Sequence, residues 1–153
     1  MKEKIKVLVV DDSTLMRTVL SDLINQSPDM EVVGRARDGQ EALELLRSLK
    51  PDVVTMDVEM PGMDGLTALE RIMKEAPVPV VMVSSLTLHG AEQTMKALQL
   101  GAVDFIAKPS GQISLDIKSI GDELKRKILI AAGTGKKLQN LYRNAEFSKT
   151  VPD

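Results

Sequence analysis

The segment VVTMDVEMPGMDG, residues 53–65, leads from an apolar run into a turn-rich loop. Asp52–Met56 has the apolar and β-branched composition of a buried strand, and Asp57 follows it directly. Apolar residues at helical spacing then cover Leu66–Ala76. A strand followed by a loop and a helix is the repeating unit of parallel α/β folds.

The same alternation of strand and helix runs through most of the chain and predicts one parallel sheet. Right-handed crossovers, with helices on both faces, favour a flavodoxin-like, doubly wound sheet of five strands in the order 2-1-3-4-5. The predicted strands are Ile5–Val10, Val32–Ala36, Asp52–Met56, Val80–Val83 and Val103–Ala107. The five predicted helices run from Leu15 toward Pro28, over Gly39–Leu49, Leu66–Ala76 and Ala91–Leu100, and along Ile113, Ile117, Ile120, Leu124 and Ile128.

Four of the predicted strands lead directly into polar or charged residues. Asp11 and Asp12 follow the first strand and Asp57 the third. Ser84 follows the fourth strand and Lys108 the fifth. Ligands of open parallel sheets bind outside the carboxyl ends of the strands, at the point where the strand order reverses. We therefore expect these side chains to lie together, with the three aspartates where the first and third strands are neighbours.

Three ionised carboxylates in one place repel one another. At about 4 Å and an effective dielectric near 20, each pair costs roughly 4 kcal/mol. A divalent cation with oxygen ligands would offset this repulsion, and a sparse carboxylate set suits Mg²⁺ better than Ca²⁺. Asp11, Asp12 and Asp57 are the candidate metal ligands. A purely structural alternative is that Asp12 or Ser13 only caps the first helix.

An aspartate can also act as a nucleophile that takes up a phosphoryl group as an acyl phosphate. Asp57 is the best candidate, because the buried strand before it would hold it in place. Charge developing on the transferred group needs cations and hydrogen-bond donors. Lys108 and the metal would supply the charge, and Ser84 would supply a hydroxyl.

These residues together resemble the receiver domain of two-component response regulators, over roughly residues 4–131. The matching motifs are Asp11-Asp12, Asp57 in its segment, Ser84 and Lys108-Pro109. The resemblance implies a CheY-like fold with Asp57 as phospho-acceptor. It also implies Mg²⁺ held by Asp11, Asp12 and Asp57 and by the backbone carbonyl of Glu59.

The resemblance further implies how the site would respond to phosphorylation. Lys108 would contact the phosphoryl group, and Ser84 would move toward it. Phe105 would turn inward as the conformational readout, and the Lys108–Pro109 peptide bond would be cis. Ser84 replaces the threonine of many receivers, which keeps the hydroxyl but removes a methyl group. Glu59, two residues after Asp57, adds a carboxylate that bears on the lifetime of the phosphate.

Residues 83–87 (VSSLT) and 101–111 (GAVDFIAKPSG) narrow the resemblance to the regulatory domain of the chemotaxis protein-glutamate methylesterases. This implies a chemotaxis histidine kinase as phosphodonor and a C-terminal domain that demethylates or deamidates chemoreceptors. That domain uses a Ser-His-Asp triad, whereas the sole histidine here is His89 and no G-x-S-x-G motif occurs. We therefore expect residues 4–131 to be the receiver domain and 132–153 an interdomain linker. Self-phosphorylation and dephosphorylation at Asp57 would be the only chemistry of this segment.

Composition excludes several other classes of protein. The net charge of −2 gives no reason to expect nucleic acid or an anionic membrane as partner. Cysteine is absent, which excludes thiol chemistry and fits a cytoplasmic protein, and no apolar run is long enough to span a membrane.

Three other functions are compatible with a parallel sheet of this kind. One alternative that the sequence leaves open is a free-standing receiver that acts by binding other proteins directly. A phosphatase with an aspartate nucleophile is disfavoured because the first two aspartates are adjacent rather than in a D-x-D pattern. A flavin carrier is disfavoured by an aromatic content of 2% and an acidic first loop.

Overall fold

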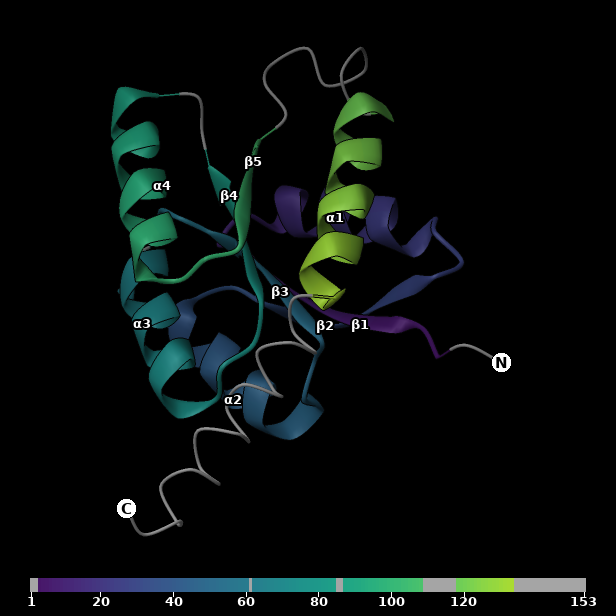
Figure 1. The fold of residues 1–153 in the computed structure, drawn as a ribbon, viewed down its shortest axis with the longest axis horizontal. Helices are drawn as coiled ribbons and strands as arrows, with labels where there is room; N and C mark the ends of the chain where they lie inside the picture. The colour runs from purple at the N-terminus through teal and green to yellow at the C-terminus, as the bar shows by residue number, and fades with distance from the viewer. Residues whose placement is uncertain (1–2, 61, 85–86, 109–117, 134–153) are drawn as a thin grey trace, which may run out of the picture.

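The computed structural model describes residues 3–60, 62–84, 87–108 and 118–133. Within these ranges it contains one five-stranded parallel sheet in the order β2-β1-β3-β4-β5, which confirms the predicted topology (Figure 1). The strands are β1 (Ile5–Val10), β2 (Met30–Ala36), β3 (Val53–Asp57), β4 (Val80–Ser84) and β5 (Asp104–Ala107).

Helices follow the strands in alternation. They are α1 (Thr14–Asn25), α2 (Gly39–Leu49), α3 (Gly65–Glu75) and α4 (Leu88–Leu100), and a further helix covers residues 118–133. The predicted start of that last helix, at Ile113 and Ile117, lies outside the described residues. The helix includes residues 132 and 133, which the sequence had placed in the linker.

The structure moves the start of α4 three residues toward the N-terminus of the chain. The sequence predicted a start at Ala91, because Gly90 suggested a loop. Instead the Thr87 hydroxyl accepts a hydrogen bond from the Gly90 backbone N–H at 2.9 Å and caps the helix. His89 consequently lies in the first turn of α4.

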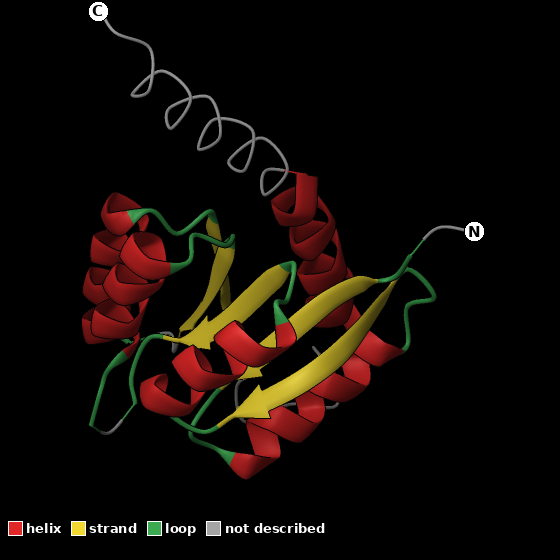
Figure 2. Cartoon of the chain, turned by 90° about the horizontal axis from the view of Figure 1, so that it is seen from below, coloured by secondary structure: helices red, strands yellow, loops and turns green. Residues whose placement is uncertain are grey.

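The helices cover both faces of the sheet, and each face has its own core (Figure 2). Buried residues of α2, α3 and α4 pack on one face, including Leu43, Leu69 and Ala97. Buried residues of α1 and of the helix over residues 118–133 pack on the other, including Ile24 and Leu124. The central strands β1, β3 and β4 are buried between these layers over most of their length, which explains why they read as nearly continuous apolar runs.

Polar side chains begin four of the helices at the carboxyl edge of the sheet. Ser13, Asp38, Asp64 and Thr87 each accept a hydrogen bond from the backbone N–H three residues later. Such N-caps satisfy otherwise unpaired backbone donors. Helix starts and strand ends therefore meet along one edge, and this edge holds the candidate site. In the described part of the chain, every helix falls short of the length and hydrophobicity needed to span a bilayer.

Candidate functional site

Three aspartates meet where β1 and β3 lie side by side. Asp11 follows β1, and Asp57 is the last residue of β3. Oxygen atoms of Asp11, Asp12 and Asp57 all lie within 4.8 Å of one another. Asp11 and Asp57 are 0% and 2% exposed, whereas Asp12 is exposed. The site is thus a buried pair of carboxylates, Asp11 and Asp57, beside a third carboxylate, Asp12, that is open to solvent.

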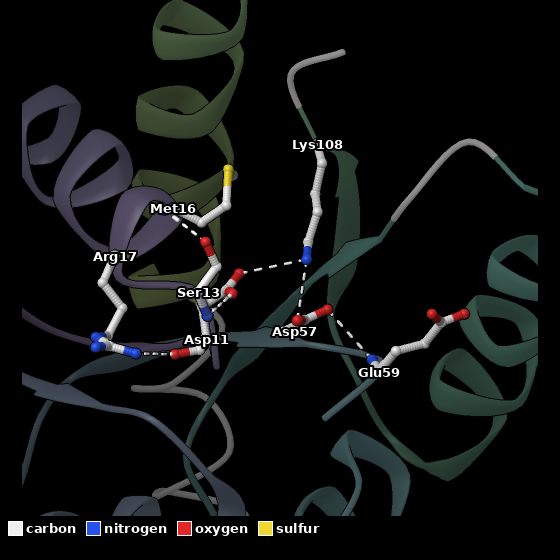
Figure 3. A network of polar contacts seen from close by, with 7 residues as sticks. All are labelled: Asp11, Ser13, Met16, Arg17, Asp57, Glu59 and Lys108. Carbon is white, nitrogen blue, oxygen red and sulfur yellow. Dashed lines mark hydrogen bonds and ion pairs between the residues drawn. The ribbon is translucent and has the colours of Figure 1, made fainter. Parts of the chain in front are cut away.

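Lys108 bridges the two buried carboxylates from the end of β5 (Figure 3). Its Nζ lies 2.9 Å from Asp57 Oδ2 and 3.5 Å from Asp11 Oδ2. Its backbone N–H donates to the carbonyl oxygen of Ser84 at 2.8 Å, which anchors the start of the loop after β5 to the end of β4. The sheet therefore positions the lysine as firmly as the aspartates.

Backbone donors orient the same carboxylates. The Ser13 N–H donates to Asp11 Oδ1 at 2.9 Å, and the Glu59 N–H donates to Asp57 Oδ1 at 3.2 Å. Among the described residues, Asp11 Oδ2 is buried and has no hydrogen-bond partner. Buried polar atoms are normally satisfied. Within the described part of the chain, this oxygen has only the ion pair with Lys108 at 3.5 Å, and together with the two other carboxylates it offers the oxygen ligands that a hard divalent cation takes.

The electrostatics reflect an excess of buried negative charge. Burial raises the pKa of Asp57 from 3.8 to about 7, although the hydrogen bond from Lys108 opposes the shift. Burial also raises the pKa of Asp11. For Lys108, burial works against the charged form, but the hydrogen bond and charge of Asp57 outweigh it and its pKa is raised. One ammonium group does not balance the cluster, and additional positive charge would stabilise the ionised carboxylates.

Gly65 holds the start of α3 directly against the end of β3. Its N–H donates to the carbonyl oxygen of Val58 at 3.1 Å. A Cβ atom at Gly65 would lie 2.3 Å from the carbonyl oxygen of Asp57 and 2.9 Å from the Cα of Val58. No residue with a side chain fits without a shift of the backbone that carries Asp57. The sequence analysis placed this glycine in a turn and missed the close approach.

The remaining predicted site residues lie around this centre. Ser84 is the last residue of β4, next to β3, and is 7% exposed. Phe105 lies on β5 and is 42% exposed. The Glu59 side chain points away from Asp57 (Figure 3). Its carboxylate lies 3.8 Å from His89 Nε2. The predicted cis bond involves Pro109, which lies outside the described residues.

Two contacts near the site had no sequence signal. Arg17 Nη1 donates to the backbone carbonyl of Asp11 at 2.7 Å, so α1 supports the loop after β1. Lys127, on the helix over residues 118–133, contacts Phe105. Both contacts join residues on different elements, and no local pattern records which surface lysine or arginine makes them.

The fold and the acidic site define a class of protein. Residues 7–118 match the response regulator receiver domain family, and the chain belongs to that family. Within it, the chain is similar to the crystal structure of the response regulator domain of Thermotoga maritima CheB. The two are 56% identical with a TM-score of 0.77, over 86% of this chain and 98% of that one.

Two further comparisons extend this result. A protein-glutamate methylesterase/protein-glutamine glutaminase of Syntrophomonas wolfei is 56% identical over 97% of this chain but only 43% of its own length. The chain thus spans less than half of that relative, and it is a receiver domain of the CheB type. A crystal structure of the P1 domain of CheA3 in complex with CheY6 from R. sphaeroides is similar with a TM-score of 0.71, at 33% identity over 86% of this chain and 99% of that one.

Proposed function

We propose that this domain accepts a phosphoryl group on Asp57 in a Mg²⁺-dependent reaction and thereby controls an attached methylesterase domain. The observation that carries the proposal is the buried pair of Asp57 and Asp11 bridged by Lys108. A nucleophilic carboxylate held beside a fixed cation and an unsatisfied carboxylate oxygen is an arrangement suited to phosphoryl transfer.

The proposed metal ligands are side-chain oxygens of Asp11, Asp12 and Asp57, with the backbone carbonyl of Glu59. The clustering of the three carboxylates supports this set, as does Asp11 Oδ2, which is buried and accepts no hydrogen bond from a described residue. When bound, Mg²⁺ would neutralise charge on the carboxylates and on the incoming phosphoryl oxygens.

In the proposed reaction an oxygen of Asp57 attacks the phosphorus of a phosphohistidine. An O–P bond forms, the N–P bond breaks, and the released imidazole takes up a proton from solvent. Lys108 keeps its proton throughout and donates to a phosphoryl oxygen instead of to Asp57. Ser84, whose hydroxyl is at the neighbouring strand end, then moves toward the phosphoryl group while Phe105 turns inward.

The proposed partners follow from the relatives. The CheA3–CheY6 complex supports a chemotaxis histidine kinase as phosphodonor. The length of the methylesterase relatives supports a C-terminal catalytic domain, through which the protein would demethylate or deamidate chemoreceptors in the cytoplasm. Residues 4–131 would be the receiver unit and 132–153 would lead toward the catalytic domain. This favours an attached effector over a free-standing receiver.

The direct test is labelling of the domain by radioactive acetyl phosphate with Mg²⁺. We expect the wild-type domain to be labelled and Asp57→Asn to be unlabelled but folded. The matched control is Asp122→Asn, because the Asp122 side chain is exposed and makes no ion pair with any described residue. Full labelling of Asp57→Asn, or labelling of the wild type in excess EDTA, would refute the proposal.

A further inference from the structure

Lys127 makes an unusual number of contacts for a surface lysine. Its Nζ lies 2.9 Å from Glu123 and 3.5 Å from Asp104, and 5.1 Å from the centroid of the Phe105 ring. The same nitrogen donates to the Phe105 carbonyl oxygen. Only 16% of the Lys127 side chain is exposed, so the stem of the side chain is packed and the ammonium is held in one place.

These contacts close the free edge of the sheet at Phe105. In the described part of the chain β5 is the edge strand of the sheet, and no described strand lies on its outer side to pair with the backbone groups of Phe105. The Asp104 side chain accepts from the Phe105 N–H at 2.8 Å, and Lys127 donates to its carbonyl. Side chains thus satisfy both backbone groups of this residue, which also protects the edge from pairing with another chain.

We propose that Lys127 is a positioning residue that holds the Phe105 ring in its outward orientation and so opposes activation of the domain. The ammonium lies within the distance at which a cation is attracted to the face of an aromatic ring. This inference rests on the proposed function in one respect, namely that Phe105 turns inward when Asp57 is phosphorylated.

Only one of the Lys127 contacts depends on the state of the switch. The hydrogen bond to the Phe105 carbonyl and the ion pairs with Asp104 and Glu123 involve the backbone or other side chains, which the rotation of a ring does not remove. The contact with the ring is lost when the ring turns inward. Lys127 therefore stabilises the outward state selectively, and only a selective interaction shifts an equilibrium between two states.

The experiment measures the affinity of the domain for beryllofluoride, a mimic of the phosphoryl group, at saturating Mg²⁺. Lys127→Met removes the charge but keeps an unbranched apolar side chain. A mimic that favours the inward state binds with an apparent affinity proportional to the population of that state. Loss of an exposed cation–π contact should therefore tighten binding by roughly two- to fivefold. Lys127→Arg, which keeps a cation over the ring, should restore the wild-type affinity.

Two controls isolate the ring contact. Lys125→Met changes a lysine on the same helix that makes no hydrogen bond or ion pair with a described residue, and it should leave the affinity unchanged. In a Phe105→Leu background, Lys127→Met should have no effect, because the ring is absent. An unchanged affinity of Lys127→Met, or an equal change with and without the ring, would overturn the inference.

An additional measurement separates this inference from the proposed function. The ring current of Phe105 should shift the Lys127 Hε proton signals in the unphosphorylated domain, and Phe105→Leu should abolish that shift. If the shift is present but the wild type neither binds the mimic nor is labelled at Asp57, the proposed function fails and the contact stands. If the mimic binds but the shift is absent, the Lys127 inference alone is wrong.

Discussion

Asp57 occupies a position in which its own charge is unfavourable. It is 2% exposed and close to Asp11, and burial raises its pKa to about 7. In the unfolded chain an aspartate ionises near pH 3.9. The folded, metal-free domain therefore binds a proton that the unfolded chain has lost between these two pH values. It follows that stability falls as the pH rises from about 4 to about 7.

We predict that Asp57→Asn stabilises the metal-free domain at pH 8. The neutral amide removes the unfavourable charge, and Lys108 keeps its ion pair with Asp11. The expected gain is on the order of 1–3 kcal/mol at pH 8 and is much smaller at pH 4.5, where the unfolded aspartate is itself partly protonated. Urea unfolding in EDTA at the two pH values measures it. A variant that is less stable than wild type at pH 8 would show that Asp57 is not under electrostatic strain.

We predict that Lys108 is needed for the conformational response to phosphorylation and not for binding of Mg²⁺. Lys108→Ala removes the cation that competes with the metal for Asp57 and Asp11, so Mg²⁺ should bind at least as tightly, by isothermal titration calorimetry. Phosphorylation or beryllofluoride should no longer move the Phe105 ring signals by NMR. Lys125→Ala is the matched control. A Lys108→Ala domain with a normal spectral response would contradict the role proposed for the lysine.

At the level of elements, the junction between β3 and α3 determines where Asp57 points. Gly65 lies so close to Asp57 and Val58 that a methyl group would collide with backbone atoms, which cannot rotate away. A side chain at this position can be accommodated only if the backbone around Asp57 and Val58 moves. The turn after β3 thus has a steric requirement that arises from the backbone of Asp57, the proposed phosphorylation site.

We predict that Gly65→Ala costs about 2–4 kcal/mol of stability, because relief of the overlap needs backbone movement. It should also slow labelling of Asp57, since the displaced backbone carries the acceptor. Gly133→Ala is the matched control, because a Cβ there meets nothing within 4 Å and the residue lies in a helix. That change should be neutral or stabilising by up to about 1 kcal/mol. Thermal unfolding and acetyl phosphate labelling test both variants.

At the scale of the whole molecule, metal binding should stabilise both cores together. The proposed ligands come from the ends of β1 and β3, which lie between the two helical layers. A ligand bound only by the folded state stabilises it by RT ln(1 + [L]/Kd), which is about 1.4 kcal/mol at ten times Kd. We therefore expect Mg²⁺ at pH 8 to raise the melting temperature of the wild type in one cooperative transition. The melting temperatures of Asp57→Asn and Asp11→Asn should rise much less on addition of Mg²⁺. An increase equal to that of the wild type would show that the metal binds elsewhere.

Phosphorylation should affect one side of the molecule more than the other. Ser84 and Phe105 lie on β4 and β5, and Lys108 follows β5. In contrast, α2 packs on β2 and β1, at the opposite edge of the sheet, and against α3. We expect beryllofluoride to shift amide NMR signals strongly at the ends of β4 and β5 and in α4, and weakly in α2. Identical spectra with and without the mimic would rule out a conformational switch.

The architecture could be read from local patterns in the sequence. Continuous apolar runs predicted the strands, because buried parallel strands need apolar residues on both faces. Alternation with helices and the handedness of crossovers then predicted the sheet order that the structure confirms. The placement of Asp11, Asp57, Ser84 and Lys108 at strand ends followed from the same patterns. Helix starts were less predictable. The helix α4 begins earlier than expected because its cap depends on one hydrogen bond, from the Gly90 N–H to the Thr87 side chain, and such a bond leaves no periodic pattern in the sequence.

The tertiary structure alone decided which of these side chains touch and what each contact does. No sequence pattern records that Lys108 lies between two buried carboxylates, that Gly65 rests on the backbone of Asp57, or that Lys127 reaches Phe105. The physical reason is range. Periodicity and capping act within a few residues, whereas these contacts join residues that only the pairing of the strands and the packing of the helices on the sheet bring within a few ångströms.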